Sequence, residues 1–118
     1  RPTVELIAEV VQRYVAAVLD AFPWPMYVYL MSIPPAGTQG NVLRLPHYAS
    51  ASQRAEYNRE FNRQLEAACN EWGLKYLDVY SLAADDHGML RADWQIGDQV
   101  HANEKWAKAA GQLLGIDL

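Results

Sequence analysis

The sequence has one cysteine, no cluster of basic residues and no long apolar stretch, and each shortage excludes a class of protein. Cys69 cannot form a disulfide within the chain, and its place on the apolar side of an expected helix favours a buried structural thiol over a nucleophile. Acidic residues outnumber basic ones by 14 to 10, which gives a net charge of -4 and no basic stripe for phosphates, so we expect no nucleic-acid partner. No apolar run reaches the roughly 18 residues of a membrane-spanning helix, so we expect no transmembrane segment.

The amino-acid composition is that of a globular domain or of part of one. Of the 118 residues, 51% are apolar and 20% are charged, which separates the chain from disordered proteins. The sequence opens on Arg1 rather than on an initiator methionine, which is consistent with a missing upstream part.

The apolar pattern predicts five elements in the order helix, strand, helix, strand and helix. They are expected at Thr3–Phe22, Met26–Ile33, Ser50–Trp72, Lys75–Tyr80 and from Asn103 onward. The helices have apolar residues three and four positions apart. Met26–Ile33 is instead a continuous apolar run, which suits a strand covered on both faces of a parallel sheet.

Local signals mark the helix ends. Ser50 and Gln53 have the spacing of a capping box, and Asn103 is a favourable N-cap with Glu104 in the first turn. Gly73 fits the left-handed residue that ends a helix. The expected buried stripe of the first helix consists of Ile7, Val11, Tyr14, Val18 and Phe22.

The central strand–helix–strand unit predicts two parallel strands joined by a right-handed crossover. Two strands alone make a marginal sheet, and the apolar run of the first strand needs neighbours on both sides. We therefore expect the sheet to be completed by an upstream segment, by a second chain, or by another copy of this chain in a homo-oligomer.

Two loops follow the expected strands, at the edge of a parallel sheet where ligands bind. Pro34–Ala49 is long and contains prolines and glycines, which is typical of binding loops. His47 in this loop either lines a substrate cleft or lies on the surface. In the second loop, Ser81–Gly97, Trp94 and Ile96 either form the wall of an apolar acyl pocket or anchor the loop by packing.

Metal-ligating residue types gather in the second loop at Asp85, Asp86 and His87, with Asp93 nearby. Adjacent residues of one loop rarely converge on one ion. The segment Asp-Asp-His-Gly instead favours a turn with Gly88 at a positive φ. We therefore expect no metal and no cofactor.

An acid, Asp98, stands three residues before His101, just ahead of the final helix. In a turn, the carboxylate can accept a hydrogen bond from the imidazole Nδ1–H, which fixes the tautomer and directs Nε2 outward as a base. The alternative is structural, with Asp98 as a surface turn residue and His101 packed against the helix start. Spacing alone does not separate the two interpretations, because so short a motif specifies little.

Four segments together resemble the C-terminal portion of the SGNH, or GDSL-type, hydrolases. They are SIPPAG (Ser32–Gly37), AEYNREFNRQLEAACNEWGLKYLDVYSL (Ala55–Leu82), DDHGML (Asp85–Leu90) and GDQVHANEKWAKAAGQLL (Gly97–Leu114). Members of this family close with Asp-x-x-His before a terminal helix, often with an asparagine two residues after the histidine, as in the segment His-Ala-Asn here. The resemblance covers nearly all of this chain but only about half of a family domain.

The resemblance implies a three-layer α/β/α fold with a parallel, flavodoxin-like sheet, of which residues 1–118 form the C-terminal part. It also implies hydrolysis of a small-molecule ester by a Ser–His–Asp triad, in which Asp98 orients the general base His101. The candidate substrate-binding residues are Trp94, Ile96, Pro35 and His47.

The chain departs from the family pattern at the nucleophile. It contains no Gly-Asp-Ser motif and no Gly-x-Asn-Asp block, and Ser81 is the best placed of its four serines although it lies outside a strand-to-helix turn. Lys105 and Trp106 also stand where many members have glycine and tyrosine or histidine. We therefore expect sequence outside this chain to supply the serine and the oxyanion hole. The alternative is a non-catalytic interaction domain that dimerises through its open sheet edge and keeps the pair as a relic.

Overall fold

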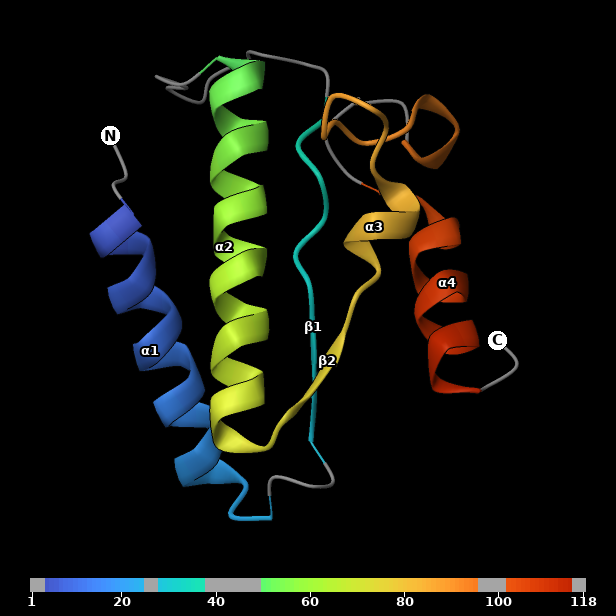
Figure 1. Ribbon diagram of the computed structural model, residues 1–118. Coiled ribbons are helices and arrows are strands. Elements are labelled where there is room, and N and C mark those ends of the chain that lie inside the picture. Colours follow the sequence, from blue (N-terminus) through green and yellow to red (C-terminus); the bar gives the residue numbers. More distant parts are fainter. Residues whose placement is uncertain (1–3, 25–27, 38–49, 96–101, 116–118) are drawn as a thin grey trace.

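The computed structural model describes residues 4–24, 28–37, 50–95 and 102–115, which form an α/β arrangement (Figure 1). In this part of the chain the elements are α1 Val4–Ala21, β1 Tyr29–Met31, α2 Ala51–Trp72, β2 Lys75–Leu77, α3 Tyr80–Ala83, the 3-10 turn η2 Ala92–Trp94 and α4 Glu104–Leu114. None of these helices is both long and apolar enough to cross a membrane.

The two strands lie side by side and run parallel, with Leu30 opposite Tyr76 and Met31 opposite Leu77. α2 connects them, so both strands end at the end of the molecule where α2 begins (Figure 1). The predicted parallel strand–helix–strand unit is therefore confirmed, and with it the α/β class.

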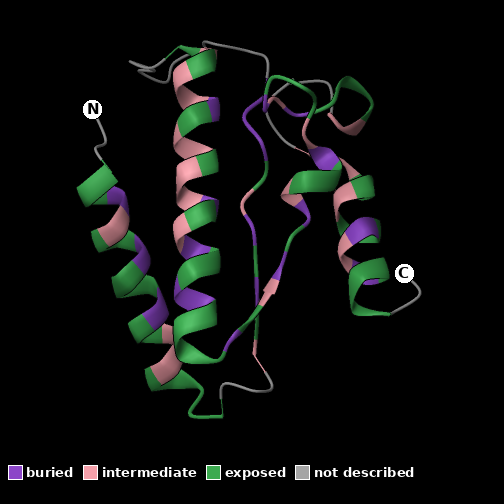
Figure 2. Cartoon of the chain, in the orientation of Figure 1, coloured by how far each residue is buried: buried purple, intermediate pink, exposed green. Residues whose placement is uncertain are grey.

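Helices lie on both faces of this small sheet. Leu30 belongs to an apolar cluster with α1 and α2, and Tyr76 packs against the same cluster. The next residue along β2, Leu77, belongs instead to a cluster with Ala109 of α4. Because successive side chains of a strand point to opposite faces, α1 and α2 cover one face and α4 covers the other. Figure 2 shows the strands between α2 and α4, with the buried residues of α1 on the side that faces α2.

The predicted helix caps are confirmed. Ser50 Oγ accepts a hydrogen bond from the Gln53 N–H at 3.1 Å, and Gln53 Oε1 accepts one from the Ser50 N–H at 2.9 Å, which completes the capping box. Gly73 ends α2 with a φ of 73°. Asn103 caps α4 by accepting a hydrogen bond from the Lys105 N–H at 2.9 Å. These contacts satisfy backbone groups that a helix end leaves open.

The second strand is shorter than the sequence predicts, and its expected extension to Tyr80 is wrong. The ladder ends at Val79, whose N–H donates to the Leu77 carbonyl at 3.1 Å and not to β1, and the Tyr80 N–H then donates to the buried hydroxyl of Ser32 at 2.9 Å. The chain then turns into α3, a helix of four residues that the sequence analysis treats as loop.

The buried face of α1 also differs from the expected stripe. Val11 and Val15 are fully buried, whereas Tyr14 and Phe22 are 46% and 58% exposed. The period of 3.6 residues allows either Tyr14 or Val15 beside Ile7 and Val11, and packing against α2 buries Val15. The prediction that Cys69 is buried is confirmed, and burial raises the pKa of its thiol.

Candidate functional site

The two loops that follow the strands are joined at the carboxyl end of the sheet. The Leu90 N–H donates to the Ala36 carbonyl at 2.8 Å, and Ala36 forms a parallel bridge with Met89. Leu90 also forms an antiparallel bridge with Ala84, just after α3. The chain beyond both strands is thus held together where open parallel sheets bind their ligands.

A second set of bonds closes the base of the segment that precedes α4. Gln95 forms an antiparallel bridge with Ala102, and the Asn103 N–H donates to the Trp94 carbonyl at 2.7 Å. The Asn103 side-chain amide donates to the Asp93 carbonyl at 2.9 Å. The residue that caps α4 therefore also fixes the chain entering the segment 96–101.

The predicted acid–base pair falls within this segment. Asp98 and His101 lie outside the described residues, as do two of the candidate substrate-binding residues, Ile96 and His47. For this pair the structure gives the position of the two flanking residues, Gln95 and Ala102, which have six residues between them and form a bridge with each other.

The other two candidate substrate-binding residues are part of the packed interior. Pro35 is buried next to the bridge formed by Ala36. Trp94 is half-buried and packs against the cluster of Leu77, Val79 and Ala109. Trp94 has the contacts of a loop anchor, and its part in an acyl pocket stays a prediction.

Lys105, which departs from the resembled family, has a contact of its own. Its Nζ lies 3.0 Å from Asp93 Oδ2, and Arg91 Nε lies 3.5 Å from Asp93 Oδ1. The hydrogen bond from Lys105 is the main reason that the pKa of Asp93 is lowered, with its charge and that of Arg91 adding to the effect. The lysine therefore links the first turn of α4 to η2, on the flank of the segment 96–101.

The described serines are engaged in local structure. Ser81 Oγ donates to Asp78 Oδ2 at 2.5 Å, and the Ser81 N–H donates to Asp78 Oδ1 at 3.1 Å. Ser32 is 2% exposed and accepts from the Tyr80 N–H. Because His101 lies outside the described residues, the place of the nucleophile stays a prediction.

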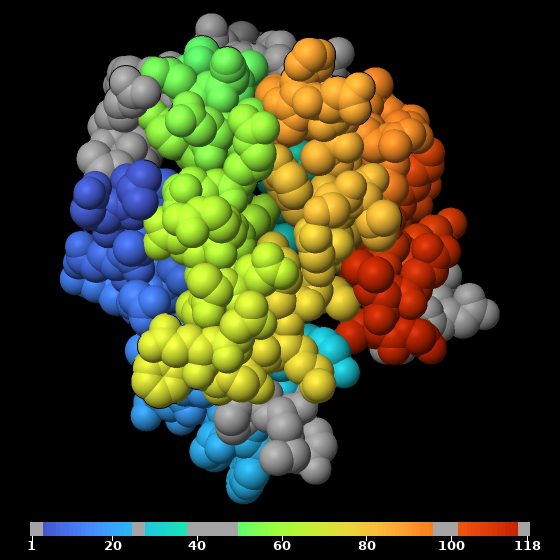
Figure 3. Space-filling view, in the orientation of Figure 1, coloured from blue at the N-terminus to red at the C-terminus, as the bar shows by residue number. Residues whose placement is uncertain are grey.

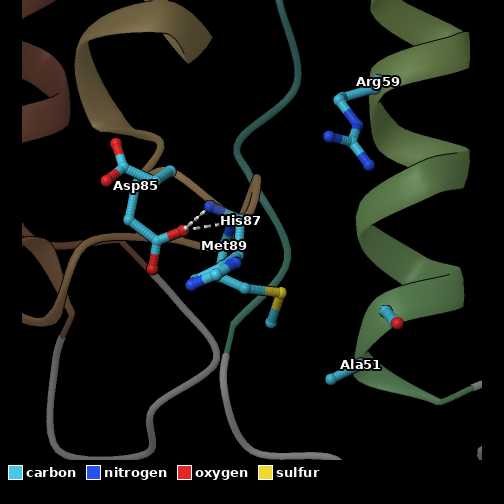
Figure 4. A pocket seen from close by; sticks show the side chains of 7 residues that line it. Ala51, Arg59, Asp85, His87 and Met89 are labelled. Atoms are coloured by element: carbon cyan, nitrogen blue, oxygen red, sulfur yellow. Dashed lines mark hydrogen bonds between the residues drawn. The ribbon is translucent and has the colours of Figure 1, made fainter.

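A depression of about 790 Å³ opens beside this end of the sheet, between the first turns of α2 and the loop after α3 (Figures 3 and 4). Its lining residues are Ala51, Ser52, Arg59, Asp85, Asp86, His87 and Met89. The predicted turn in this loop is confirmed, because Asp85 Oδ1 accepts from the His87 N–H at 2.8 Å and from the Met89 N–H at 3.0 Å. Gly88 has a φ of 75°, as expected. Within the described ranges, no group of three or more histidine, cysteine, aspartate or glutamate side chains is arranged to hold a metal ion.

Sequence reasoning missed one contribution to this depression. The sequence places Tyr80 at the end of a strand, whereas in the structure Tyr80 begins α3, and its hydroxyl and the guanidinium of Arg59 both lie next to Gly88. The pKa of Tyr80 is raised, mainly because the hydroxyl is buried, and the nearby Arg59 charge partly offsets this effect. No spacing in the sequence links these residues, since they meet only once the loop folds back onto α2.

Comparison with known proteins gives a likeness at the level of the fold. A solved structure from Streptococcus pneumonia, described as that of "a putative platelet activating factor", is similar to this chain with a TM-score of 0.64 and 16% sequence identity. The match covers 94% of this chain and 49% of that chain, so the present chain spans about half the length of its structural neighbour. No protein-family model and no curated protein matches the sequence.

Proposed function

We propose that this chain carries the acid–base part of an ester-hydrolysing active site of the SGNH type. The observation that carries the proposal is the closed base of the segment 96–101 at the carboxyl end of the parallel strands, formed by the Gln95–Ala102 bridge and by Asn103. This is the part of an α/β sheet where binding sites form. The segment contains the Asp-x-x-His motif, and the fold is shared with a protein of about twice the length.

In the proposed reaction, Asp98 accepts a hydrogen bond from His101 Nδ1–H and so keeps Nε2 free as a base. Nε2 takes the proton of a serine hydroxyl as the serine oxygen attacks the ester carbonyl. The tetrahedral intermediate collapses to an acyl-serine while Nε2–H protonates the departing alcohol. Water, deprotonated by the same histidine, then attacks the acyl-serine, and the acid is released with the proton returned to the serine.

The serine of this reaction belongs, in our proposal, to a further polypeptide segment that also extends the sheet next to β1. Among the described residues, β1 pairs with β2 alone. Tyr29 and Met31, on the face that α4 incompletely covers, are 52% and 42% exposed. A strand added at this edge would use the open backbone groups of β1 and bring its own helix against these side chains.

A second candidate function is a non-catalytic interaction domain. It is favoured by the large apolar side chains that the described fold leaves exposed on α1, among them Val10 at 49% and Tyr14 at 46%. Contiguous apolar surface of this kind often marks an interface. In that case the acid–histidine pair takes no part in a reaction.

Labelling with a serine-reactive fluorophosphonate tests the choice. The complete protein is expected to label and to hydrolyse short-chain p-nitrophenyl esters, and His101→Ala should abolish both. His87→Ala is the matched control, because His87 is an exposed histidine in the neighbouring loop. If the 118-residue chain by itself is labelled, and His101→Ala abolishes this labelling, then the nucleophile lies within the chain. The proposal that a further segment supplies the serine would then be wrong. A complete protein that neither labels nor hydrolyses these esters would support the interaction domain.

A further inference from the structure

Two polar groups from different elements converge on one point beside Gly88. A Cβ atom at this buried glycine would lie 3.2 Å from the hydroxyl oxygen of Tyr80 and 3.3 Å from NH1 of Arg59. Tyr80 begins α3, and Arg59 lies on α2, on the side of the depression opposite the loop with Asp85 and His87 (Figure 4). A side chain at this position would crowd both groups, so glycine allows the Tyr80 hydroxyl and the Arg59 guanidinium to approach the backbone closely.

The Tyr80 hydroxyl is buried and has no hydrogen-bond partner within the part of the chain that the structure describes. Buried hydroxyl groups in folded proteins are nearly always paired, so one that is not paired is a place where a missing partner is expected. The raised pKa of Tyr80 keeps the hydroxyl protonated at neutral pH, and the group is therefore able to donate.

Arg59 differs from the other described arginines in having neither a hydrogen bond nor an ion pair in the described ranges. Arg13, Arg63 and Arg91 each contact a carboxylate, and Arg54 donates to the Gly37 carbonyl. A guanidinium presents several donors in a planar fork that matches the oxygens of carboxylate and phosphate groups. Counting the described residues alone, the donors of Arg59 are thus available next to an unpaired hydroxyl.

The charges around this point allow a small anion to bind. The depression also contains the carboxylates of Asp85 and Asp86 and the imidazole of His87. One oxygen of Asp85 is occupied by the backbone of its turn. At the Tyr80 hydroxyl, the charge of Arg59 acts more strongly than that of Asp85. The nearby carboxylates leave little room for further negative charge, so a compact oxyanion held directly by Arg59 fits this point better than a bulky ligand.

We propose that Arg59, Tyr80 and the backbone at Gly88 form a binding subsite for a carboxylate or phosphate group. One ligand oxygen accepts from the guanidinium, and the Tyr80 hydroxyl donates to another. The subsite is independent of the ester chemistry proposed above. It is built from residues of α2, of α3 and of the loop that connects α3 to η2. The ligand is a small molecule or a substrate that carries such a group.

Titration of the full chain with acetate and with inorganic phosphate, at constant ionic strength and followed by amide chemical shifts in NMR, tests the subsite. We expect a saturable shift of the Gly88 amide with at least one of the two anions, and the anion that binds more tightly identifies carboxylate or phosphate as the preferred group. Arg59→Gln and Tyr80→Phe should each weaken binding by about tenfold, since each removes a donor to a charged oxygen. The absence of a saturable shift, or equal affinity in Arg59→Gln, would overturn the proposal.

A pair of glycine variants separates occupation of the subsite from backbone strain. Gly88 and Gly115 share a φ of 75°, and a Cβ at Gly115 meets nothing within 4 Å. Gly88→Ala and Gly115→Ala therefore carry similar backbone strain, but only Gly88→Ala places a methyl group against Arg59 and Tyr80 and displaces them. We expect loss of anion binding in Gly88→Ala and unchanged binding in Gly115→Ala. Unchanged binding in a folded Gly88→Ala protein would refute the proposed geometry, and if that variant does not fold, Arg59→Gln decides, because Arg59 is exposed.

Discussion

The two faces of the sheet differ in how completely they are covered. On one face, α1 and α2 enclose a cluster of buried residues that includes Val11, Leu30 and Leu65. On the other face, α4 covers a smaller cluster around Leu77, while Met31 of the adjacent strand stays 42% exposed. Burial of apolar surface dominates folding free energy, so most of the stability of this chain resides on the first face.

The sparsely covered face is also the one from which the chain leads to the candidate site. η2 and α4, which flank the segment with Asp98 and His101, pack against the cluster around Leu77. The difference suggests a division of labour between the two faces. One face stabilises the fold, and the other carries the acid–base part of an active site that a further segment completes. Each of the following experiments tests whether substitutions on the two faces have different effects on catalysis and on stability.

The largest effect is expected from Asp98→Asn in the complete protein. An amide in place of the carboxylate leaves the imidazole of His101 in the wrong tautomer, so kcat should fall by up to about 10⁴-fold. Ester hydrolysis and thermal unfolding are measured on the same preparation, and the melting temperature should change little.

The control for this change is Asp86→Asn, an exposed aspartate of the neighbouring loop. It should leave kcat near the original value. A loss of folding in Asp98→Asn with no separate effect on the rate would show that the pair is structural. The proposal of a catalytic pair on the α4 face would then be wrong.

The next effect concerns stability, and it compares leucines on the two faces. Leu65→Ala removes a side chain that is 1% exposed within the cluster of α1 and α2, and should lower the free energy of unfolding by about 2–5 kcal/mol. Leu77→Ala, on the α4 face, should have a smaller effect because fewer apolar groups surround it. Leu113→Ala, at a residue that is 48% exposed, should stay within about 0.5 kcal/mol.

Urea unfolding of the three variants provides the measurement, with the denaturant slope checked for constancy. If Leu77→Ala destabilised the chain as much as Leu65→Ala does, the two faces would be equally important and the division of labour would be wrong.

The features that the sequence predicts correctly are those decided by local chemistry. Ser50, Gly73 and Asn103 mark helix ends because each satisfies backbone groups within its own turn. The turn at Asp85 and Gly88 follows from the same kind of local bonding. Such contacts depend on residues no more than four positions apart, so a single sequence reveals them.

The features that the sequence misses depend on residues far apart in the chain. α3 begins just after β2, where the Tyr80 N–H donates to the hydroxyl of Ser32, a residue 48 positions away in sequence. Arg59 and Gly88 meet only because the second loop folds over α2. For the site itself, the Asp-x-x-His motif predicts a chemistry, while its bonded flanks, Gln95 and Ala102, become visible only in the structure.

A moderate effect is expected from Asn103→Ala, which should cost about 1 kcal/mol as the loss of an N-cap. Asn103 also bonds Asp93 at the other end of the segment 96–101, so we expect kcat to fall as well. Ser50→Ala, the loss of the cap of α2, should cost a similar free energy and leave kcat unchanged. Equal kcat values in both variants would mean that the flanks of the segment do not position the catalytic pair.

The smallest effect is expected from the contact of Lys105 with Asp93, and it depends on pH. Since the folded protein lowers the pKa of Asp93, the contact contributes stability above the unfolded value of about 3.9, and this contribution is lost as the pH falls through the lower folded value. Lys105→Gln should therefore reduce the melting temperature slightly at pH 7 and in low salt, and by less at pH 3. Lys108→Gln, at an exposed position of the same helix, is the matched control and should show no such pH dependence. A difference between Lys105→Gln and the original protein that persists unchanged at pH 3 would mean that the lysine acts through packing of its alkyl chain, and that the link between α4 and η2 is apolar rather than ionic.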